Sequence, residues 1–320
     1  MTADVFITRA LPEPATEPLV EAGLSVDYRS DDSGCPPEEL HRRSAGVRGL
    51  LTVLSDRIDA AALDAAGPEL RVVANCAVGF DNIDLGAAAE RGVVVTNTPD
   101  VLTEATADLA WSLLMATARR VVEGDRLVRS GAWRSPSLIL LLGAPVHGKT
   151  LGVIGLGKIG GAVARRGRGF SMPILYTNRS RNAEAEAELG AERVELDELL
   201  ERADFVSVNA PLNDDSRHLI DAAALARMKP TAILINAGRG PIVDEAALVD
   251  ALRAGRIAGA GLDVYEREPA LADGLAELDN VVLMPHVGSA TTETRGAMVR
   301  LAAANIAAVL AGDDAVTPVR

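Results

Sequence analysis

The 320-residue sequence contains few cysteines and histidines, and this scarcity excludes two common ways of stabilising a fold. Its two cysteines, Cys35 and Cys76, cannot build a disulfide framework. Its four histidines are scattered without the spacing of metal ligands, so we expect no structural metal. Stability is therefore expected to come from a buried apolar core.

Positive charge and long apolar stretches are also scarce. The 32 Lys and Arg residues face 45 Asp and Glu, and the formal net charge of −13 repels phosphate backbones and anionic lipid surfaces. We therefore expect neither a nucleic-acid partner nor a membrane partner. The longest stretch without a polar side chain, Leu138–Val146, has nine residues and is too short to span a bilayer. The N-terminal segment lacks the pattern of a signal peptide, so we expect a cytoplasmic protein.

Short β-branched runs alternate with alanine-rich helical patterns along the chain, which is typical of parallel βαβ units. The fold class is predicted to be α/β, with two doubly wound parallel sheets. Four strands are expected in the first sheet, at Val5–Thr8, Gly49–Val53, Arg71–Ala74 and Val93–Thr96. Six are expected in the second, at Leu151–Ile154, Ile174–Tyr176, Phe205–Val208, Ile233–Ile235, Ala258–Asp263 and Val281–Met284.

The length predicts two domains, at roughly 150 residues per domain. Amphipathic helices are expected at Thr103–Arg119 and Ala290–Leu310, where the chain would cross to the second domain and return. The first domain is then discontinuous, with residues 1–101 and 289–320, and the second comprises residues 102–288. We expect a small α/β first domain and a second domain built on a six-stranded doubly wound sheet.

A glycine-rich loop between an expected strand and an expected helix predicts the cofactor site. Its first glycine permits a tight turn, its second lets a pyrophosphate approach the backbone, and its third lets helix and strand pack closely. In this context the pattern GxGxxG indicates dinucleotide binding, although the glycines could serve only a close-packed turn. The loop consists of Gly155, Leu156, Gly157, Lys158, Ile159 and Gly160.

A second phosphate-binding pattern lies just upstream. Residues 143–150 fit GxxxxGK[ST], the loop of nucleotide triphosphatases. Such a loop must open a helix, whereas Thr150 leads directly into a β-rich segment. We therefore interpret Gly148-Lys149-Thr150 as a turn that enters the cofactor strand.

The preferred cofactor follows from an absence of acidic residues. An NAD site places Asp or Glu near the end of its second strand, on the ribose 2′-hydroxyl, but none occurs between Gly161 and Ala183. Asn178, Arg179 and Ser180 stand there instead and can donate to a 2′-phosphate. We expect NADP(H) to be preferred, with NAD(H) possible. The alternative is that the arginines of this loop are only solvated charges.

Three candidate reactive side chains, Arg239, Glu268 and His286, each follow a strand of the second series. Ligands bind beyond the carboxyl ends of the strands in open α/β sheets, so all three are expected at one crevice. The guanidinium suits a substrate carboxylate, the imidazole can give a proton to a developing alkoxide, and the carboxylate can fix the imidazole tautomer. Taken singly, each could be a surface or turn residue, but their joint placement indicates an active site for hydride transfer to a 2-keto acid.

The sequence resembles the D-2-hydroxyacid dehydrogenase family over nearly its whole length, most closely the glyoxylate/hydroxypyruvate reductase branch. The resemblance implies a catalytic triad of Arg239, Glu268 and His286, with His286 as the proton donor. The motifs that carry it are Leu54–Asp56, Val78–Asp84, Thr96–Thr103, Gly155–Gly160, Asn236–Gly240, Glu268-Pro269 and Pro285–Ala290. Besides the glycine loop, it implies cofactor contacts from Thr106, Asn209, Pro211, Ala237, Arg239, Asp263, His286 and Gly288.

The resemblance also implies a flavodoxin-like substrate domain, a Rossmann-type cofactor domain, a substrate site and a homodimer. The substrate carboxylate would be held by Arg239 and the backbone near Val78 and Gly79, and His286 would also contact the substrate. Leu54 and Trp133 indicate a small, partly apolar pocket. Family members commonly pair through an extension that corresponds to residues 121–147 here. The apolar segment at residues 135–142 is expected to be buried in that interface.

Other functions remain open at this point. An NAD-linked phosphoglycerate or D-lactate type dehydrogenase is disfavoured by the acid-free loop and, mildly, by the lack of an expected C-terminal regulatory domain. Formate dehydrogenases of the same family carry Gln where Glu268 stands, so formate oxidation is also disfavoured. A dinucleotide-sensing corepressor-like binding protein is the alternative from a different class, because one fold hosts several functions.

Overall fold

The computed structural model describes residues 3–319, which form two compact units. The first unit comprises the chain up to Leu102 and again from Ser289, and the second comprises Thr103–Gly288. Each unit is a parallel sheet covered by helices, as predicted for the fold class. Among the described residues, no helix is long and apolar enough to cross a membrane.

The first unit contains a five-stranded sheet in the order β2-β1-β3-β4-β5, with every pairing parallel. This is a flavodoxin-like strand order, in agreement with the flavodoxin-like domain that was expected. Its strands are β1 (Val5–Ile7), β2 (Val26–Tyr28), β3 (Gly49–Thr52), β4 (Val72–Asn75) and β5 (Val94–Thr96). The prediction of four strands was wrong because β2, at the edge of the sheet, is only half-buried and reads Val-Asp-Tyr without an apolar run.

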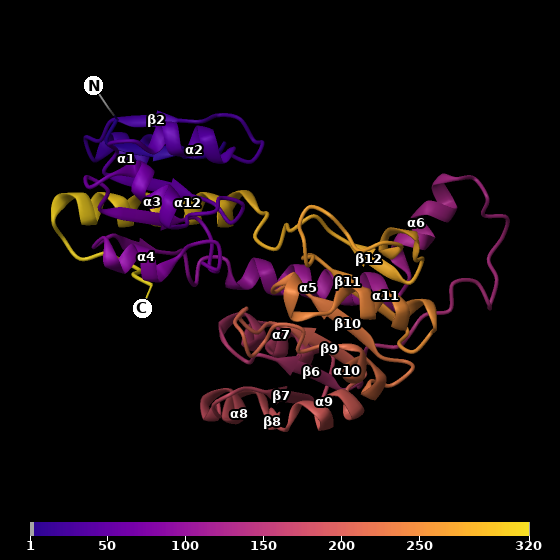
Figure 1. Cartoon of the computed structure of the whole chain (residues 1–320). Helices are drawn as coiled ribbons and strands as arrows, with labels where there is room; N and C mark the ends of the chain where they lie inside the picture. The colour runs from indigo at the N-terminus through magenta and orange to yellow at the C-terminus, as the bar shows by residue number, and fades with distance from the viewer. Residues whose placement is uncertain (1–2, 320) are drawn as a thin grey trace. The chain divides into compact units, whose positions relative to one another are not determined.

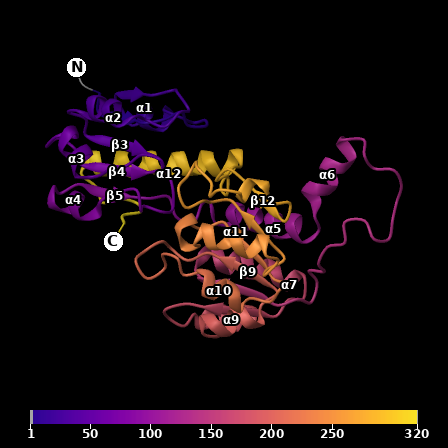
Figure 2. The same ribbon diagram turned by 45° about the vertical axis from the view of Figure 1, so that its right-hand side comes forward.

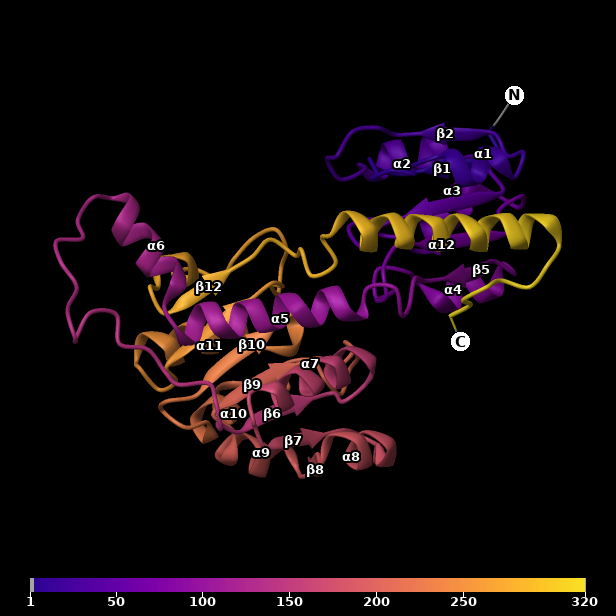
Figure 3. The same cartoon turned by 180° about the vertical axis from the view of Figure 1, so that it is seen from behind.

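Helices cover both faces of this sheet. Alternate residues of each strand point to opposite faces, so Phe6 and Leu50 lie in one apolar core while Val5 and Leu51 lie in the other. The second core is closed by the long C-terminal helix α12, which runs across the sheet in Figure 3. The helices are α1 (Glu17–Glu21), α2 (Pro37–Ser44), α3 (Ala60–Ala66), α4 (Leu85–Glu90) and α12 (Thr292–Ala311).

The second unit contains a seven-stranded sheet in the order β12-β11-β10-β9-β6-β7-β8. The strand order reverses between β6 and β9, which creates the switch point where such sheets bind ligands. The strands are β6 (Leu151–Ile154), β7 (Ile174–Thr177), β8 (Glu192–Arg193), β9 (Phe205–Val208), β10 (Ile233–Asn236), β11 (Gly259–Leu262) and β12 (Val281–Leu283). The prediction of six strands was wrong because it missed β8, an exposed edge strand of two charged residues.

The helices of the second unit form two layers around the sheet (Figure 1). One layer packs so closely on β11 that a Cβ on Gly261 would lie 2.9 Å from the Leu113 side chain. On that face lie α5 (Thr103–Ala118), α7 (Lys158–Gly169) and α8 (Ala183–Leu189). On the other face lie α9 (Leu196–Arg202), α10 (Ala222–Arg227) and α11 (Glu245–Arg253).

One helix and the loop after it do not pack on the sheet. Helix α6 (Val121–Arg129) contains no buried residue, and Figure 2 shows it and the following loop extending away from the rest of the second unit. The chain returns through residues 143–150 and enters β6 directly after Thr150. Because no helix begins there, the phosphate-loop pattern is a turn, as interpreted.

Candidate active site

The three glycines of the GxGxxG loop after β6 differ in their surroundings. Gly155 has a φ of +91°, and a Cβ there would lie 2.6 Å from the backbone nitrogen of Ala210. A Cβ on Gly160 would overlap the carbonyl oxygen of Gly155. A Cβ on Gly157, in contrast, would meet no atom within 4 Å. Only glycine fits the first and third positions, while the second lies beside open space.

The open position is also the N-terminus of a helix. Gly157 is the N-cap of α7 and provides no side chain to the first turn, which contains Lys158, Ile159 and Gly160. The N–H groups of a first helical turn have no partner within the helix and attract anions. This turn can therefore bind a phosphate group through its backbone.

Asn178 supports the glycine loop from the end of β7. Its Oδ1 accepts a 2.6 Å hydrogen bond from the Leu156 N–H, and the Asn182 amide donates to the Leu156 carbonyl at 2.9 Å. Arg179 and Ser180 are exposed beside it. Arg181 forms a 2.6 Å ion pair with Glu186, so its charge is already engaged within the loop.

Asp263, at the end of β11, is a buried carboxylate that is only partly satisfied. Its side chain is 1% exposed, and its Oδ1 accepts a 2.8 Å hydrogen bond from the Val287 N–H. Its Oδ2 has no hydrogen-bond partner within residues 3–319. Burial raises the pKa of Asp263, although the Val287 N–H and the charge of His286 oppose the shift. A Cβ on Gly288 would lie 3.3 Å from Oδ2 and 3.4 Å from Thr106, so these three predicted cofactor positions meet.

The loops after β9 and β10 lie beside the glycine loop. A Cβ on Gly238 would lie 3.2 Å from the carbonyl oxygen of Val208, so the segment containing Ala237 adjoins the one containing Asn209. The Asn209 amide donates to the Ser207 hydroxyl at 3.0 Å, and the Ser216 hydroxyl donates to the Pro211 carbonyl at 2.7 Å. These contacts place the remaining predicted cofactor residues at the carboxyl edge of the sheet.

Glu268 and His286 form a hydrogen-bonded pair. The distance from His286 Nδ1 to Glu268 Oε2 is 2.7 Å, and about a third of each side chain is exposed. Burial disfavours ionisation of Glu268, but the hydrogen bond and charge of His286, with the charge of Arg239, hold the pKa of Glu268 below its ordinary value. His286 has a φ of +53°, and its N–H donates to the Asp263 carbonyl at 2.8 Å. Glu268 and the backbone contact to Asp263 therefore fix the position of the imidazole ring.

Arg239 is held by its own loop after β10. The Asn236 amide donates to the Arg239 carbonyl at 3.0 Å, and Arg239 Nη1 donates to the Gly238 carbonyl at 3.0 Å. The side chain is half-buried, and its charge influences Glu268. Because β10, β11 and β12 are neighbours and parallel, the three predicted catalytic residues follow adjacent strands at one edge of the sheet.

The predicted substrate residues of the first unit follow β3 and β4 at the carboxyl edge of its own sheet. Leu54 comes two residues after β3, and Val78 and Gly79 follow β4. The Asn97 amide donates to the Val78 carbonyl at 2.7 Å, and the Asn75 amide donates to the Gly79 carbonyl at 2.8 Å. Asparagine side chains thus fix the backbone of this loop.

Trp133 and the apolar segment after it lie in the loop that follows α6. Trp133 is 49% exposed, and its indole donates to the Ser135 carbonyl at 3.0 Å. Leu138 and Ile139 are 97% and 81% exposed. In the single chain this segment is therefore open to solvent.

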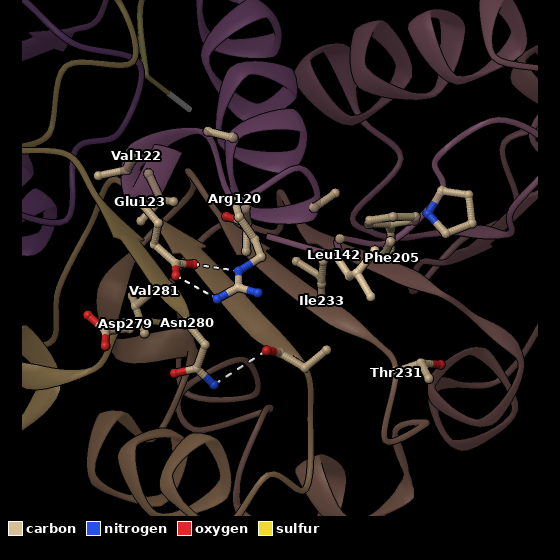
Figure 4. A pocket seen from close by; sticks show the side chains of 18 of the residues that line it. Arg120, Val122, Glu123, Leu142, Phe205, Thr231, Ile233, Asp279, Asn280 and Val281 are labelled. Atoms are coloured by element: carbon tan, nitrogen blue, oxygen red, sulfur yellow. Dashed lines mark hydrogen bonds and ion pairs between the residues drawn. The ribbon is translucent and has the colours of Figure 1, made fainter. Parts of the chain in front are cut away.

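A cavity of about 580 Å³ lies at the opposite edge of the second sheet, where the strands begin. Phe205, Ile233 and Val281 contribute apolar walls, and Arg120 and Glu123, which also line the cavity, form a 2.7 Å ion pair (Figure 4). None of the predicted site residues is among those that line it. The cavity is therefore separate from the candidate active site at the carboxyl edge of the sheet.

Two polar features near Glu268 were missed from the sequence. Glu245, the first residue of α11, accepts hydrogen bonds from the backbone of the loop that carries Glu268. His218 Nε2 lies 2.9 Å from Glu266 Oε1, which makes a second histidine–glutamate pair. An acidic residue at the start of a helix is common, so no sequence signal distinguishes Glu245.

Known proteins similar to this chain share its fold and sequence. Residues 111–288 match the family described as D-isomer specific 2-hydroxyacid dehydrogenase, NAD binding domain. A glyoxylate reductase from Thermococcus kodakarensis is 51% identical over 317 residues, which cover 98% of this chain and 95% of that protein. A crystal structure of a protein from Thermus thermophilus has a TM-score of 0.92, with 44% identity over 99% of both chains.

A second solved structure carries a functional description. It is an NADPH-dependent glyoxylate/hydroxypyruvate reductase from Sinorhizobium meliloti, in complex with NADP and malonate, with a TM-score of 0.87. Its sequence is 36% identical, and the match covers 98% of this chain and 96% of that chain. Fold, glycine loop and sequence identity lead to the same conclusion: this chain belongs to the D-2-hydroxyacid dehydrogenase family, as an enzyme that binds a nicotinamide dinucleotide.

Proposed function

We propose that this enzyme reduces a small 2-keto acid, glyoxylate or hydroxypyruvate, to the 2-hydroxy acid, with NADPH preferred over NADH. The observation that carries the proposal is the 2.7 Å Glu268–His286 pair, which lies under the electrostatic influence of Arg239 at the carboxyl edge of the second sheet. The Thermococcus kodakarensis relative is named a glyoxylate reductase, and the Sinorhizobium meliloti reductase is described as NADPH-dependent.

The residues present fit a nicotinamide dinucleotide. Asp263 Oδ2 is a buried acceptor without a partner among the described residues, and it suits the N–H donors of a carboxamide. Thr106 and Gly288 adjoin it, and the open face of Gly157 at the start of α7 suits the pyrophosphate. When bound, the reduced cofactor supplies a hydride to the substrate carbonyl.

The chain's own residues supply binding and proton transfer. Arg239 binds the substrate carboxylate with its planar guanidinium and polarises the keto oxygen. His286 is bonded to Glu268 through Nδ1, so its Nε2 is the atom that gives a proton to the developing alkoxide. Glu268 fixes the tautomer and stabilises the imidazolium. The family resemblance assigns Leu54, Val78 and Gly79 of the first unit to the substrate as well.

The preference for NADPH rests on the end of β7. A carboxylate there would repel a 2′-phosphate, and the sequence provides Asn178, Arg179 and Ser180 instead. Arg179 and Ser180 are exposed, so they can reach a ligand. Asn178 Oδ1 is engaged with Leu156, and its contribution is therefore mainly to hold the glycine loop beside the adenosine ribose.

A matrix of initial rates tests the proposal. NADPH and NADH are each combined with glyoxylate, hydroxypyruvate, pyruvate and 3-phosphohydroxypyruvate. We expect turnover of the first two acids with NADPH and markedly slower turnover with NADH. Faster reaction with NADH, or pyruvate as the best substrate, would favour an NAD-linked dehydrogenase of the D-lactate type. Tight dinucleotide binding without turnover of any acid would favour a dinucleotide-sensing protein.

The oligomeric state proposed for this enzyme is a homodimer. The exposed apolar side chains of residues 138–142 form a surface that a second copy could cover, and solvent exposure of such a surface is unfavourable. Trp133 lies on the same loop and would approach the substrate site of the partner.

A further inference from the structure

We propose that Glu245 is a positioning residue for the Glu268–His286 pair, because its carboxylate holds the loop on which Glu268 lies. The proposal rests on the proposed function, since it gives Glu245 a role toward the same pair. The carboxylate accepts from backbone N–H groups of the loop rather than from Glu268 or His286, so it would act through the backbone.

Both oxygens of the Glu245 carboxylate bind this loop. Oε2 accepts a 2.7 Å hydrogen bond from the Glu266 N–H, and Oε1 accepts one of the same length from the Ala272 N–H. The two N–H groups flank Glu268 in the sequence. Hydrogen bonds from N–H groups to an ionised carboxylate are short and roughly twice as strong as neutral ones. Glu245 therefore closes the loop at both ends.

The carboxylate is not needed to begin its own helix. Asp244 is already the N-cap of α11, and its side chain accepts a 3.0 Å hydrogen bond from the Ala247 N–H. Glu245 is only 5% exposed, and burying a carboxylate is costly unless it is fully hydrogen-bonded. Its placement is explained by the two loop N–H groups rather than by the helix.

The segment that ends at Glu245 contacts the loop at a second point. Gly240, which follows Arg239, lies so close that a Cβ there would overlap the Tyr265 carbonyl. The Tyr265 N–H then donates to Glu268 Oε1 at 3.0 Å. Gly240 and Glu245 thus both contact the backbone of the loop that carries Glu268, and both lie on the segment that begins with Arg239.

Two further bonds connect the loop with its surroundings. The Tyr265 hydroxyl donates to the Met284 carbonyl at 2.8 Å, which joins the loop to the end of β12 just before His286. Glu266 Oε1 pairs with His218 on the loop after β9. The loop is thus held at Tyr265 and at Glu266 as well as by the Glu245 carboxylate.

Loss of the Glu245 carboxylate should therefore displace Glu268 rather than the cofactor site. A small misplacement of a catalytic group can lower the rate by orders of magnitude. We expect Glu245→Gln to lower kcat at least about tenfold. The dissociation constant for NADPH should stay within about twofold, because the Glu245 carboxylate bonds to the Glu266 and Ala272 N–H groups and to neither the glycine loop nor Asp263.

A double-mutant cycle tests the proposal in the full-length enzyme. Wild type, E245Q, E268Q and the double variant are compared for kcat with glyoxylate, and NADPH binding is measured by fluorescence titration. If Glu245 acts through Glu268, E245Q should lower kcat in the wild type but change it less than about twofold when Glu268 is already Gln. E245D, which retains the charge on a shorter side chain, should be partly active and replaces E245Q in the cycle if that variant unfolds.

Asp244→Ala is the matched control, because it removes the N-cap from the same helix. It should lower thermal stability and leave kcat within about twofold. The role of Glu245 would be overturned if E245Q and E268Q lowered kcat independently of each other. It would also be overturned if E245Q kept the kcat of the wild type, or if D244A lowered kcat as much as E245Q does. Failure of the proposed function is distinguishable, because the wild type would then lack turnover or E268Q would be fully active.

Discussion

Asp263 is almost fully buried, and only one of its carboxylate oxygens has a hydrogen-bond partner among the described residues. A raised pKa in the folded state means that ionisation at neutral pH opposes folding. The penalty is present above the folded pKa and disappears once pH falls below the unfolded value. This loss of folding stability is explained if Oδ2 of Asp263 accepts a hydrogen bond from a bound ligand.

Asp263→Asn should therefore increase stability and weaken cofactor binding. At pH 7 the melting temperature without ligand should exceed that of the wild type, and the difference should vanish as pH falls to about 4. The amide oxygen can still accept from Val287, but its NH2 group cannot accept from a carboxamide. Thermal unfolding across this pH range and NADPH titration check both effects. A variant that is less stable at pH 7 and binds NADPH normally would contradict them.

At the scale of elements, the strand–loop–helix at residues 151–169 is the proposed binding site of the dinucleotide pyrophosphate. Gly157→Ala adds a methyl group in open space, so the fold should be retained while the approach of the pyrophosphate is hindered. We expect stability within about 1 kcal/mol of the wild type and a dissociation constant for NADPH at least about tenfold higher. Chemical unfolding and fluorescence titration give the two numbers.

Gly161→Ala is the control for this prediction. A Cβ at Gly161 also meets no atom within 4 Å, but the residue lies inside α7. Its alanine variant should be more stable by up to about 1 kcal/mol and bind NADPH as the wild type does. Equal loss of affinity in both variants would show that the helix, rather than the approach at Gly157, is responsible.

The sequence predicted elements well where a buried strand or long helix leaves a strong pattern. The predicted bounds of β6 and β9, Leu151–Ile154 and Phe205–Val208, match the structure, whereas the edge strands β2 and β8 were missed because they have charged or half-buried residues. Arg239, Glu268 and His286 were singled out as candidates because each follows a strand. Glu245 was not, because its partners are backbone N–H groups, which leave no trace in side-chain identity.

At the scale of the whole molecule, the exposed loop after α6 predicts association between copies. Replacing Ile139 with Asp places a charge in the apolar segment, where burial of an unpaired carboxylate is unfavourable. We expect the wild type to sediment as a dimer and I139D to shift toward monomer. Because Ile139 is 81% exposed in the single chain, the variant should keep the secondary structure of the wild type. A monomeric wild type, or an unchanged dimer in I139D, would exclude this surface as the interface.

The rate of the His286→Ala variant is the most direct measure of the proposed chemistry. Steady-state turnover of glyoxylate with saturating NADPH is compared with that of the wild type, and NADPH affinity is measured in parallel. The proton-donor role predicts that kcat falls by about 10² to 10⁴ while the dissociation constant for NADPH stays within about threefold. An unchanged kcat would contradict the role of the Glu268–His286 pair as the source of the proton.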